Sequence, residues 1–295
     1  MQFLRYLHNG VERCGVADGG AIREIREVEW GLRDLFVLAA TRRLDVLAGA
    51  ETAVRSPHEV TLLPPLIPTS RVYCIGVNYL EHQIESRDVF IAAPPGAPVV
   101  FLKDLSAMAA PGAELQLPET VSGEFDWEVE LAVVIGAPAR AVAPEAAGAV
   151  IAGYTVANDV TARDLQVRHV QWTLGKNIPA STPIGPGVVP WDEVGTTPDL
   201  RITLDVNGIR KQDARTSELL FGIPALIAEV SAATTLHPGD VIVTGTPSGV
   251  GFKRNPPEFL RDGDVVEACV EGIGTLTNRI RTRSPLTIPA EEAIA

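Results

Sequence analysis

The alternation of hydrophobic and polar residues changes in character near residue 68. Before that point, Met1–Leu7 and Gly20–Val28 are short strand-like stretches, and Leu32–Ala50 has the spacing of a helical segment. The stretch Leu62–Pro68 contains three prolines, which exclude a helix and favour an extended connector. We therefore predict a small N-terminal α+β domain over residues 1–68.

After Ser70 the chain consists mainly of short β-rich runs separated by Gly/Pro turns. The predicted strands are 71–77, 98–102, 129–135, 151–157, 200–206, 241–244 and 265–270, and the predicted helices are 79–86, 162–170 and 223–233. Because these strands do not alternate regularly with helices, a doubly wound parallel sheet is disfavoured. The pattern predicts a β-rich α+β fold over residues 69–283, followed by a loosely attached tail at 284–295.

Composition and charge narrow the possible partners. The 295 residues carry 25 Lys and Arg against 37 Asp and Glu, a net charge of −12, which argues against nucleic acid or an anionic membrane as the main partner. The longest weakly polar run, residues 146–157, is too short to span a bilayer, and the N-terminal residues show no apolar signal segment. The three widely spaced cysteines fit a reducing compartment, so we predict a cytoplasmic protein.

Two glutamates stand at the start of the most apolar predicted strand. Glu128 and Glu130 are two positions apart, so on a strand they point to the same face, about 7 Å apart. That spacing lets both carboxylates reach one hard cation, whereas the alternative is a solvated strand end. Asp159 follows the next apolar strand and is either a third oxygen ligand or a turn or helix-capping residue. With few Cys and His residues in the chain, any metal would be held by oxygen atoms, as Mg²⁺, Mn²⁺ or Ca²⁺ is.

Further candidate residues lie on predicted helical stretches. His82 and Glu85 have the i, i+3 spacing that lets a carboxylate orient an imidazole as a general base, although the same spacing occurs in surface pairs. Lys176 is either solvated or directed at an anionic intermediate. Arg163 and Gln166 share one helical face and are either carboxylate-binding or ordinary surface residues.

Two stretches near the candidate residues have a distinctive composition. Residues 245–251 are glycine-rich, but their spacing fits no phosphate-binding or nucleophile motif, and they are interpreted as a bend between strands. Residues 85–98 combine a charged stretch with Pro-Pro-Gly directly after the His/Glu pair. That composition is as typical of a lid over an active site as of a plain surface loop.

The order of these fragments over about residues 70–280 closely resembles the fumarylacetoacetate hydrolase family. The resemblance rests on Cys74-Ile75-Gly76-Val77-Asn78-Tyr79 with His82 and Glu85, Phe101-x-Lys103, Asp126-Trp127-Glu128-x-Glu130, Asn158-Asp159-Val160-Thr161-Ala162-Arg163-Asp164-x-Gln166, Gly175-Lys176, and Gly245-Thr246-Pro247-x-Gly249-Val250-Gly251. There are two departures: Asp104 stands where the family often has Pro, and the stretch 177–182 replaces the family's usual Ser-Phe-Asp-Thr.

The resemblance implies a mixed β-sandwich roll, usually a homodimer, with a smaller N-terminal domain. It implies Mg²⁺ or Mn²⁺ held by the carboxylates and a His/Glu pair that activates water. It also implies a lysine that stabilises an oxyanion, and a set of substrate-contacting side chains. The corresponding residues here are Glu128, Glu130 and Asp159 for the metal, His82, Glu85 and Lys176 for catalysis, and Arg163, Gln166 and Thr246 for the substrate.

The implied reaction is hydrolysis of a carbon–carbon bond in a small 1,3-dicarbonyl acid of the acylpyruvate or fumarylpyruvate type. Activated water would attack the distal carbonyl and leave a metal-stabilised enolate. The same site could serve oxaloacetate decarboxylation, keto–enol isomerisation or 2-hydroxy-diene-dioate isomerisation. A non-catalytic member of the family would need the ligands without His82, Glu85 and Lys176, all of which are present.

Overall fold

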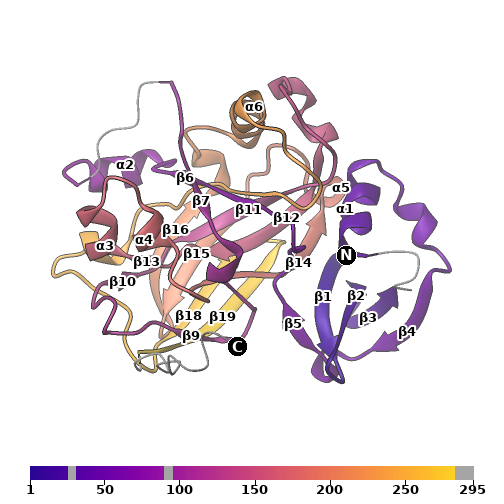
Figure 1. The fold of residues 1–295 in the computed structure, drawn as a ribbon, viewed down its shortest axis with the longest axis horizontal. Coiled ribbons are helices and arrows are strands. Elements are labelled where there is room, and N and C mark those ends of the chain that lie inside the picture. Colours follow the sequence, from indigo (N-terminus) through magenta and orange to yellow (C-terminus); the bar gives the residue numbers. More distant parts are fainter. Residues whose placement is uncertain (26–30, 90–95, 283–295) are drawn as a thin grey trace, which may run out of the picture.

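The computed structural model describes residues 1–25, 31–89 and 96–282 (Figure 1). The end of the predicted strand 20–28, the centre of the predicted lid and the predicted tail 284–295 lie outside the described residues.

Most strands belong to one large mixed sheet. Among the described residues it has twelve strands, of which ten follow the order β4-β3-β2-β1-β14-β12-β11-β17-β6-β7, while β5 pairs with β1 and β8 with β14. Their bounds are β1 (Gln2–His8), β2 (Val11–Asp18), β3 (Ala21–Ile25), β4 (Glu51–Arg55), β5 (Thr61–Leu63), β6 (Val72–Gly76), β7 (Val99–Lys103), β8 (Met108–Ala109), β11 (Val129–Ile135), β12 (Ile151–Asn158), β14 (Thr182–Pro190) and β17 (Val241–Val243).

A second sheet covers one face of the central strands. It has the order β16-β15-β18-β19-β9, and a short two-stranded ribbon joins β10 to β13. The bounds are β9 (Glu114–Gln116), β10 (Phe125–Asp126), β13 (Thr161–Ala162), β15 (Arg201–Val206), β16 (Ile209–Arg215), β18 (Val265–Val270) and β19 (Gly274–Arg281). This strand-rich mixed α+β architecture agrees with the predicted fold class.

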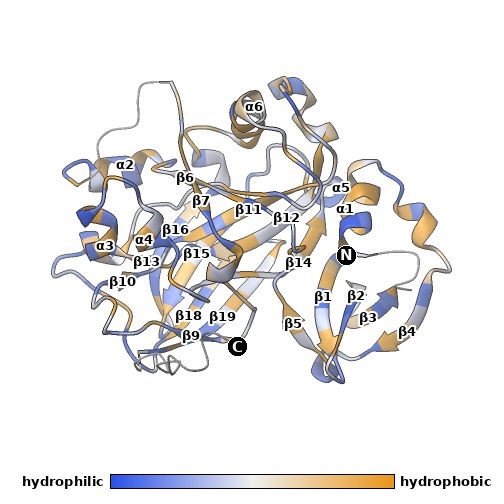
Figure 2. Ribbon diagram, viewed as in Figure 1, coloured by the Kyte–Doolittle hydropathy of each residue, from blue (hydrophilic) through white to orange (hydrophobic). Residues whose placement is uncertain are grey.

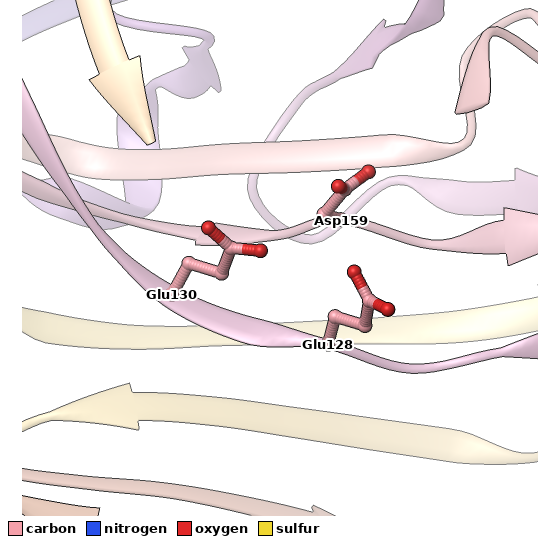
Figure 3. A group of neighbouring side chains, drawn as sticks. All are labelled: Glu128, Glu130 and Asp159. Atoms are coloured by element: carbon pink, nitrogen blue, oxygen red, sulfur yellow. The ribbon is translucent and has the colours of Figure 1, made fainter. Parts of the chain in front are cut away.

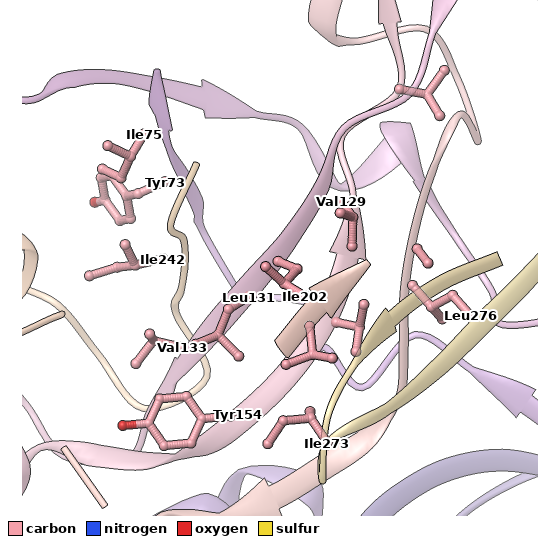
Figure 4. Close-up of a cluster of buried hydrophobic side chains, with 14 of the residues drawn as sticks. Tyr73, Ile75, Val129, Leu131, Val133, Tyr154, Ile202, Ile242, Ile273 and Leu276 are labelled. Carbon is pink, nitrogen blue, oxygen red and sulfur yellow. The ribbon is translucent and has the colours of Figure 1, made fainter. Parts of the chain in front are cut away.

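The main core lies between the two sheets. Val129, Leu131 and Val133 of β11 pack with Ile202 of β15 and Leu276 of β19 in one buried cluster (Figure 4). Alternate residues of β11 point the other way, since Ala132 and Val134 belong to a different cluster. All seven residues of β11 are buried, so the strand is covered on both faces, which explains its near-continuous hydrophobic sequence.

The N-terminal strands join the large sheet rather than forming a separate one. Phe3 of β1 pairs with Val188 of β14. Phe3, Leu35 and Phe36 also share a buried cluster with Val134. Figure 2 shows hydrophobic residues on the strands and helices of both parts of the chain. The division at residue 68 remains a prediction about chain organisation.

The helices lie around the sheets. They are α1 (Leu32–Ala40), α2 (Leu80–Ser86), α3 (Arg163–Arg168), α4 (Thr173–Lys176), α5 (Trp191–Val194) and α6 (Ile223–Ala233). The predicted helix over 32–50 was too long: α1 ends at Ala40, and Arg42 then adopts the left-handed φ of 59°, which interrupts the helix before a short 3₁₀ turn at Leu44–Leu47. None of the helices in the described ranges has the length and apolar character needed to cross a membrane.

The strand directions bring several chain segments to one edge of the large sheet. β17 runs parallel to β6 and antiparallel to β11, which is itself antiparallel to β12. The carboxyl ends of β6, β12 and β17 therefore meet the beginning of β11. This edge is where Glu128, Asp159, residue 245 and the start of α2 come together.

The close packing of the central strands predicts a specific stability effect. A Cβ added at Gly153 of β12 would lie 2.1 Å from the carbonyl oxygen of Val189 on β14. We expect Gly153→Ala to lower the free energy of unfolding by about 3 kcal/mol, because backbone atoms of a central strand would have to move. Chemical denaturation measures this. Gly123→Ala is the matched control, since its added Cβ meets nothing within 4 Å, and an equal loss in both variants would contradict the interpretation.

Candidate metal and acid–base site

Three buried carboxylates form the centre of the site. Glu128, Glu130 and Asp159 each offer an oxygen such that these atoms all lie within 4.8 Å of one another (Figure 3). Glu130 belongs to β11 and Glu128 precedes it, so the two-residue repeat of a strand puts both on one face, as predicted. Asp159 follows β12, and its N–H donates to the carbonyl of Glu128 at 2.8 Å, which fixes the third carboxylate beside the first.

Three cationic side chains surround this cluster. The Nζ of Lys176 lies 2.6 Å from Glu128 Oε2 and 2.7 Å from Asp159 Oδ2. Lys103 pairs with the other oxygen of Asp159, and Arg163 Nη2 lies 2.6 Å from Glu128 Oε1. All three cations are buried. Charges removed from water are stable only when paired in this way.

The surroundings of Glu130 differ from those of Glu128 and Asp159. One of its oxygens accepts a hydrogen bond from the N–H of Gly245, and the ion pairs found among the described residues include none to Glu130. Burial, followed by the charges of Asp159 and Glu128, raises the pKa of Glu130 well above its ordinary value. Burial acts in the same direction on Glu128, but Arg163 and Lys176 outweigh it and lower the pKa of Glu128 to about 2.

The charge balance fits a divalent cation. With Asp126, which pairs with Arg163, the buried network holds four carboxylates against three cationic side chains, so one negative charge is uncompensated when Glu130 is ionised, as a metal ligand must be. Three carboxylate oxygens converging in a buried space are the donor set that Mg²⁺ or Mn²⁺ binds. A bound divalent ion would leave the network with one net positive charge. Such a site attracts an anionic substrate.

The predicted general base lies next to this cluster. His82 and Glu85 are both on α2, and His82 Nδ1 is 2.7 Å from Glu85 Oε1. A carboxylate facing Nδ1 holds the proton on that nitrogen, which leaves Nε2 free to accept one. His82 is buried, whereas Glu85 is partly exposed and its second oxygen accepts the N–H of Gly249 at 3.2 Å.

The predicted oxyanion-stabilising lysine lies against two of the proposed ligands. Lys176 ends α4, and its ammonium group also lies 5.3 Å from the centre of the Phe101 ring. Burial would lower the pKa of Lys176, but Asp159 and Glu128 outweigh burial and raise it to about 12. The side chain therefore stays cationic at neutral pH and can stabilise negative charge on a ligand next to the metal.

The three predicted substrate-binding residues differ in their surroundings. Gln166 and Thr246 line the pocket above the carboxylates. The hydroxyl of Thr246 is fixed by Gln212 Nε2 at 2.8 Å and by the carbonyl of Val129 at 3.0 Å. Arg163 lies behind the pocket wall, where Nη1 donates to Gln166 Oε1 at 2.9 Å and Nε to Asp126 Oδ2 at 2.8 Å.

The pocket brings together most of the predicted site. Its walls include His82, Glu128, Glu130, Asp159, Gln166, Lys176 and Thr246. Apolar groups close the rest, among them Phe101 and Trp172, whose rings meet edge to face with centres 5.4 Å apart. An added Cβ at Gly76 would lie 2.5 Å from the Trp172 ring, so the glycine lets the indole lie against the strand end. Glu85 and Arg163 support the pocket from behind.

Sequence reasoning assigned no role to several residues that organise the site. Lys103 forms an ion pair with Asp159, Asp126 pairs with Arg163, and Gln212 accepts the N–H of Val129 at 3.0 Å. Trp172 forms part of the pocket wall. The motifs Phe101-x-Lys103 and Asp126-Trp127-Glu128 were the available signal for two of them. Gln212 lies on β16, a strand that the pattern did not predict.

Comparisons with known proteins show the family of this chain. The family described as "Fumarylacetoacetate (FAA) hydrolase C-terminal" matches residues 71–281. A mitochondrial oxaloacetate tautomerase of Homo sapiens is 42% identical over 233 residues, covering 78% of this chain and 73% of the human protein. The oxaloacetate tautomerase YisK of Bacillus subtilis is 41% identical over 226 residues, covering 76% of this chain and 74% of that protein.

Solved structures give the same result. A fumarylacetoacetate hydrolase from Exiguobacterium antarcticum superposes with a TM-score of 0.84 at 35% identity, covering 96% of this chain and 100% of that one. A 2-hydroxyhepta-2,4-diene-1,7-dioate isomerase from Mycobacterium marinum superposes with a TM-score of 0.77 at 34% identity, covering 97% and 100% of the two chains. With its buried acidic cluster and adjacent His/Glu pair, this chain belongs to the fumarylacetoacetate hydrolase family.

Proposed function

We propose that this protein is a divalent-metal-dependent tautomerase that interconverts the keto and enol forms of oxaloacetate or a closely similar 2-oxo dicarboxylate. The observation that carries the proposal is a single pocket that holds the acidic cluster, a buried histidine and a buried lysine. Relatives about 42% identical are named oxaloacetate tautomerases, which supports this substrate. A dianion also matches a pocket that becomes positive once a divalent cation binds.

The chemistry needs one proton removed from carbon and one delivered to oxygen. A divalent cation on Glu128, Glu130 and Asp159 would bind the 2-oxo acid and stabilise the enolate as a Lewis acid. His82, oriented by Glu85, takes the C3 proton through Nε2. Lys176 donates a hydrogen bond to the C2 oxygen as negative charge develops there. Transfer of the proton from His82 to that oxygen completes the enol and restores the free Nε2 of His82.

Carbon–carbon bond hydrolysis of an acylpyruvate or fumarylpyruvate is the second candidate. The observation that favours it is the same His82–Glu85 pair, because a carboxylate-oriented imidazole can also activate water. Decarboxylation of oxaloacetate and 2-hydroxy-diene-dioate isomerisation would use the same enolate. A homodimer and a cytoplasmic location also remain predictions, and several of the relatives carry "mitochondrial" in their names.

The deciding experiment compares substrates with one enzyme preparation and Mg²⁺. We expect faster relaxation of the ultraviolet absorbance of enol-oxaloacetate toward its equilibrium value, with no pyruvate released from acylpyruvates. Pyruvate release without any acceleration of tautomerisation would overturn the proposal and favour the hydrolase. Buffer containing Mg²⁺ alone supplies the background rate.

Metal dependence is the first prediction from this site. Chelation followed by gel filtration should abolish turnover, and added Mg²⁺ or Mn²⁺ should restore it. Glu130→Gln should weaken Mg²⁺ binding at least about 100-fold in calorimetry, because it removes a charged ligand from a three-carboxylate set. Glu145→Gln, on an exposed turn, is the control. Full activity in rigorously metal-free protein would refute metal dependence.

The acid–base role of His82 gives a separate prediction. His82→Ala should lower kcat at least about 100-fold, the usual contribution of a positioned general base. Mg²⁺ affinity should stay within about threefold, because the imidazole is outside the ligand set. Stopped-flow kinetics and calorimetry measure the two effects. Unchanged turnover would exclude His82 as the base, and lost metal binding would make it a ligand instead.

A further inference from the structure

The glycine-rich loop 245–252 makes contacts that the proposed mechanism does not use. Three of its backbone N–H groups donate to carboxylates with three different tasks: Gly245 to Glu130, Gly249 to Glu85 and Gly251 to Asp126. These carboxylates belong to the metal cluster, to the His82 pair and to the buried partner of Arg163. One loop therefore contacts the metal cluster, the His82–Glu85 pair and the carboxylate that binds Arg163.

The loop has little freedom to move. Gly245 and Gly249 both have φ of 100°, and an added Cβ at Gly249 would lie 2.2 Å from the carbonyl oxygen of Lys211. Trp127 Nε1 donates to the carbonyl of Gly249 at 3.2 Å. A Cβ at Gly251 would lie 2.1 Å from the carbonyl oxygen of Glu258. Backbone groups on both sides thus determine the position of the loop.

Asp126 is the principal anchor. Its Oδ1 accepts the N–H groups of Gly251 at 2.7 Å and Trp127 at 2.8 Å. Its Oδ2 accepts Arg163 Nε at 2.8 Å and the N–H of Phe252 at 3.1 Å. Asp126 is fully buried, and Arg163, 4.3 Å from the centre of the Phe252 ring, continues to Glu128. Asp126 therefore binds the loop directly and connects it, through Arg163, to Glu128 of the metal cluster.

We propose that Asp126 is a positioning residue: it holds the 245–252 loop so that Glu85 with His82 and the ligands Glu128 and Glu130 keep a fixed spacing. The effect on turnover rests on the proposed function, whereas the loop geometry does not. Glu85, Glu128 and Glu130 then keep their positions through a residue that does not itself contact the substrate. A misplacement of about 1 Å in such a site can cost about 100-fold in rate.

Asp126→Asn tests this with little change in shape. An amide has one acceptor oxygen, so in either orientation its NH₂ faces two of the four donors. We expect kcat to fall at least about tenfold, with KM changed less than about threefold. In metal-free protein, nuclear magnetic resonance should show shifted signals for the Trp127 indole N–H and the His82 ring, a readout that does not depend on activity.

Asp240→Asn is the matched control. Asp240 is also buried and binds an arginine; its Oδ1 accepts Arg71 N at 2.9 Å and Nε at 3.2 Å, and its Oδ2 accepts His237 N at 2.8 Å and Arg71 Nη2. We expect it to lower Tm as much as Asp126→Asn does but to leave kcat within about twofold. An equal loss of kcat in both variants, or unshifted Trp127 and His82 signals in Asp126→Asn, would overturn the proposal.

Hydrogen exchange of the unmodified protein tests the same idea if Asp126→Asn does not fold. The amides of Gly245 and Gly251 should exchange at least about 100-fold more slowly than that of Gly208, which lies in an exposed hairpin turn. Exchange as fast as at Gly208 would show that the loop is not held and would overturn the proposal. If the unmodified enzyme has no tautomerase activity, but the nuclear magnetic resonance shifts and the hydrogen exchange are as expected, the proposed function is rejected. The positioning role of Asp126 is then retained.

Discussion

Three like-charged carboxylates brought together in a buried space impose the main constraint on this structure. Isolated charges in such a place are unstable, so the fold must supply compensating charge or leave a place for a cation. With the buried partner of Arg163, Asp126, there are four carboxylates, and Lys103, Lys176 and Arg163 compensate all but one unit of their negative charge when all four are ionised. The remaining negative charge is the physical basis for a divalent metal at Glu130.

The strand arrangement explains how these charges come together. Because β11 pairs with β12 and β17, the start of one strand meets the ends of two others. The parallel strand β6 ends at the same edge and leads into α2 with His82 and Glu85. The apolar residues of these strands form hydrophobic cores on both faces of the sheet. The strand ends that carry the polar site are therefore held in place by side chains that take no part in the reaction. Reaction differences within the family can then arise from loops without altering this frame.

The sequence predicted the strands with long apolar runs and missed several without such runs. The all-buried β11 and β12 were found because their apolar runs are long. β14 was missed because it contains three prolines, which normally argue against a strand, yet it pairs with β1 and β12 in the large sheet. For the site, the two-residue repeat placed Glu128 and Glu130 on one face, and the family resemblance assigned them to the metal. The contact of Lys103 with Asp159 crosses 56 positions of sequence, and no local pattern contains such a contact.

The central claim is that one divalent cation joins the three carboxylates and presents a small dicarboxylate to His82. A crystal structure with Mn²⁺ and oxalate, collected for anomalous scattering, tests it most directly. The account predicts one anomalous peak about 2.1 Å from an oxygen of each of Glu128, Glu130 and Asp159, with oxalate bound to the same ion and facing His82. A peak elsewhere, or no peak with Lys176 still bridging Glu128 and Asp159, would contradict it.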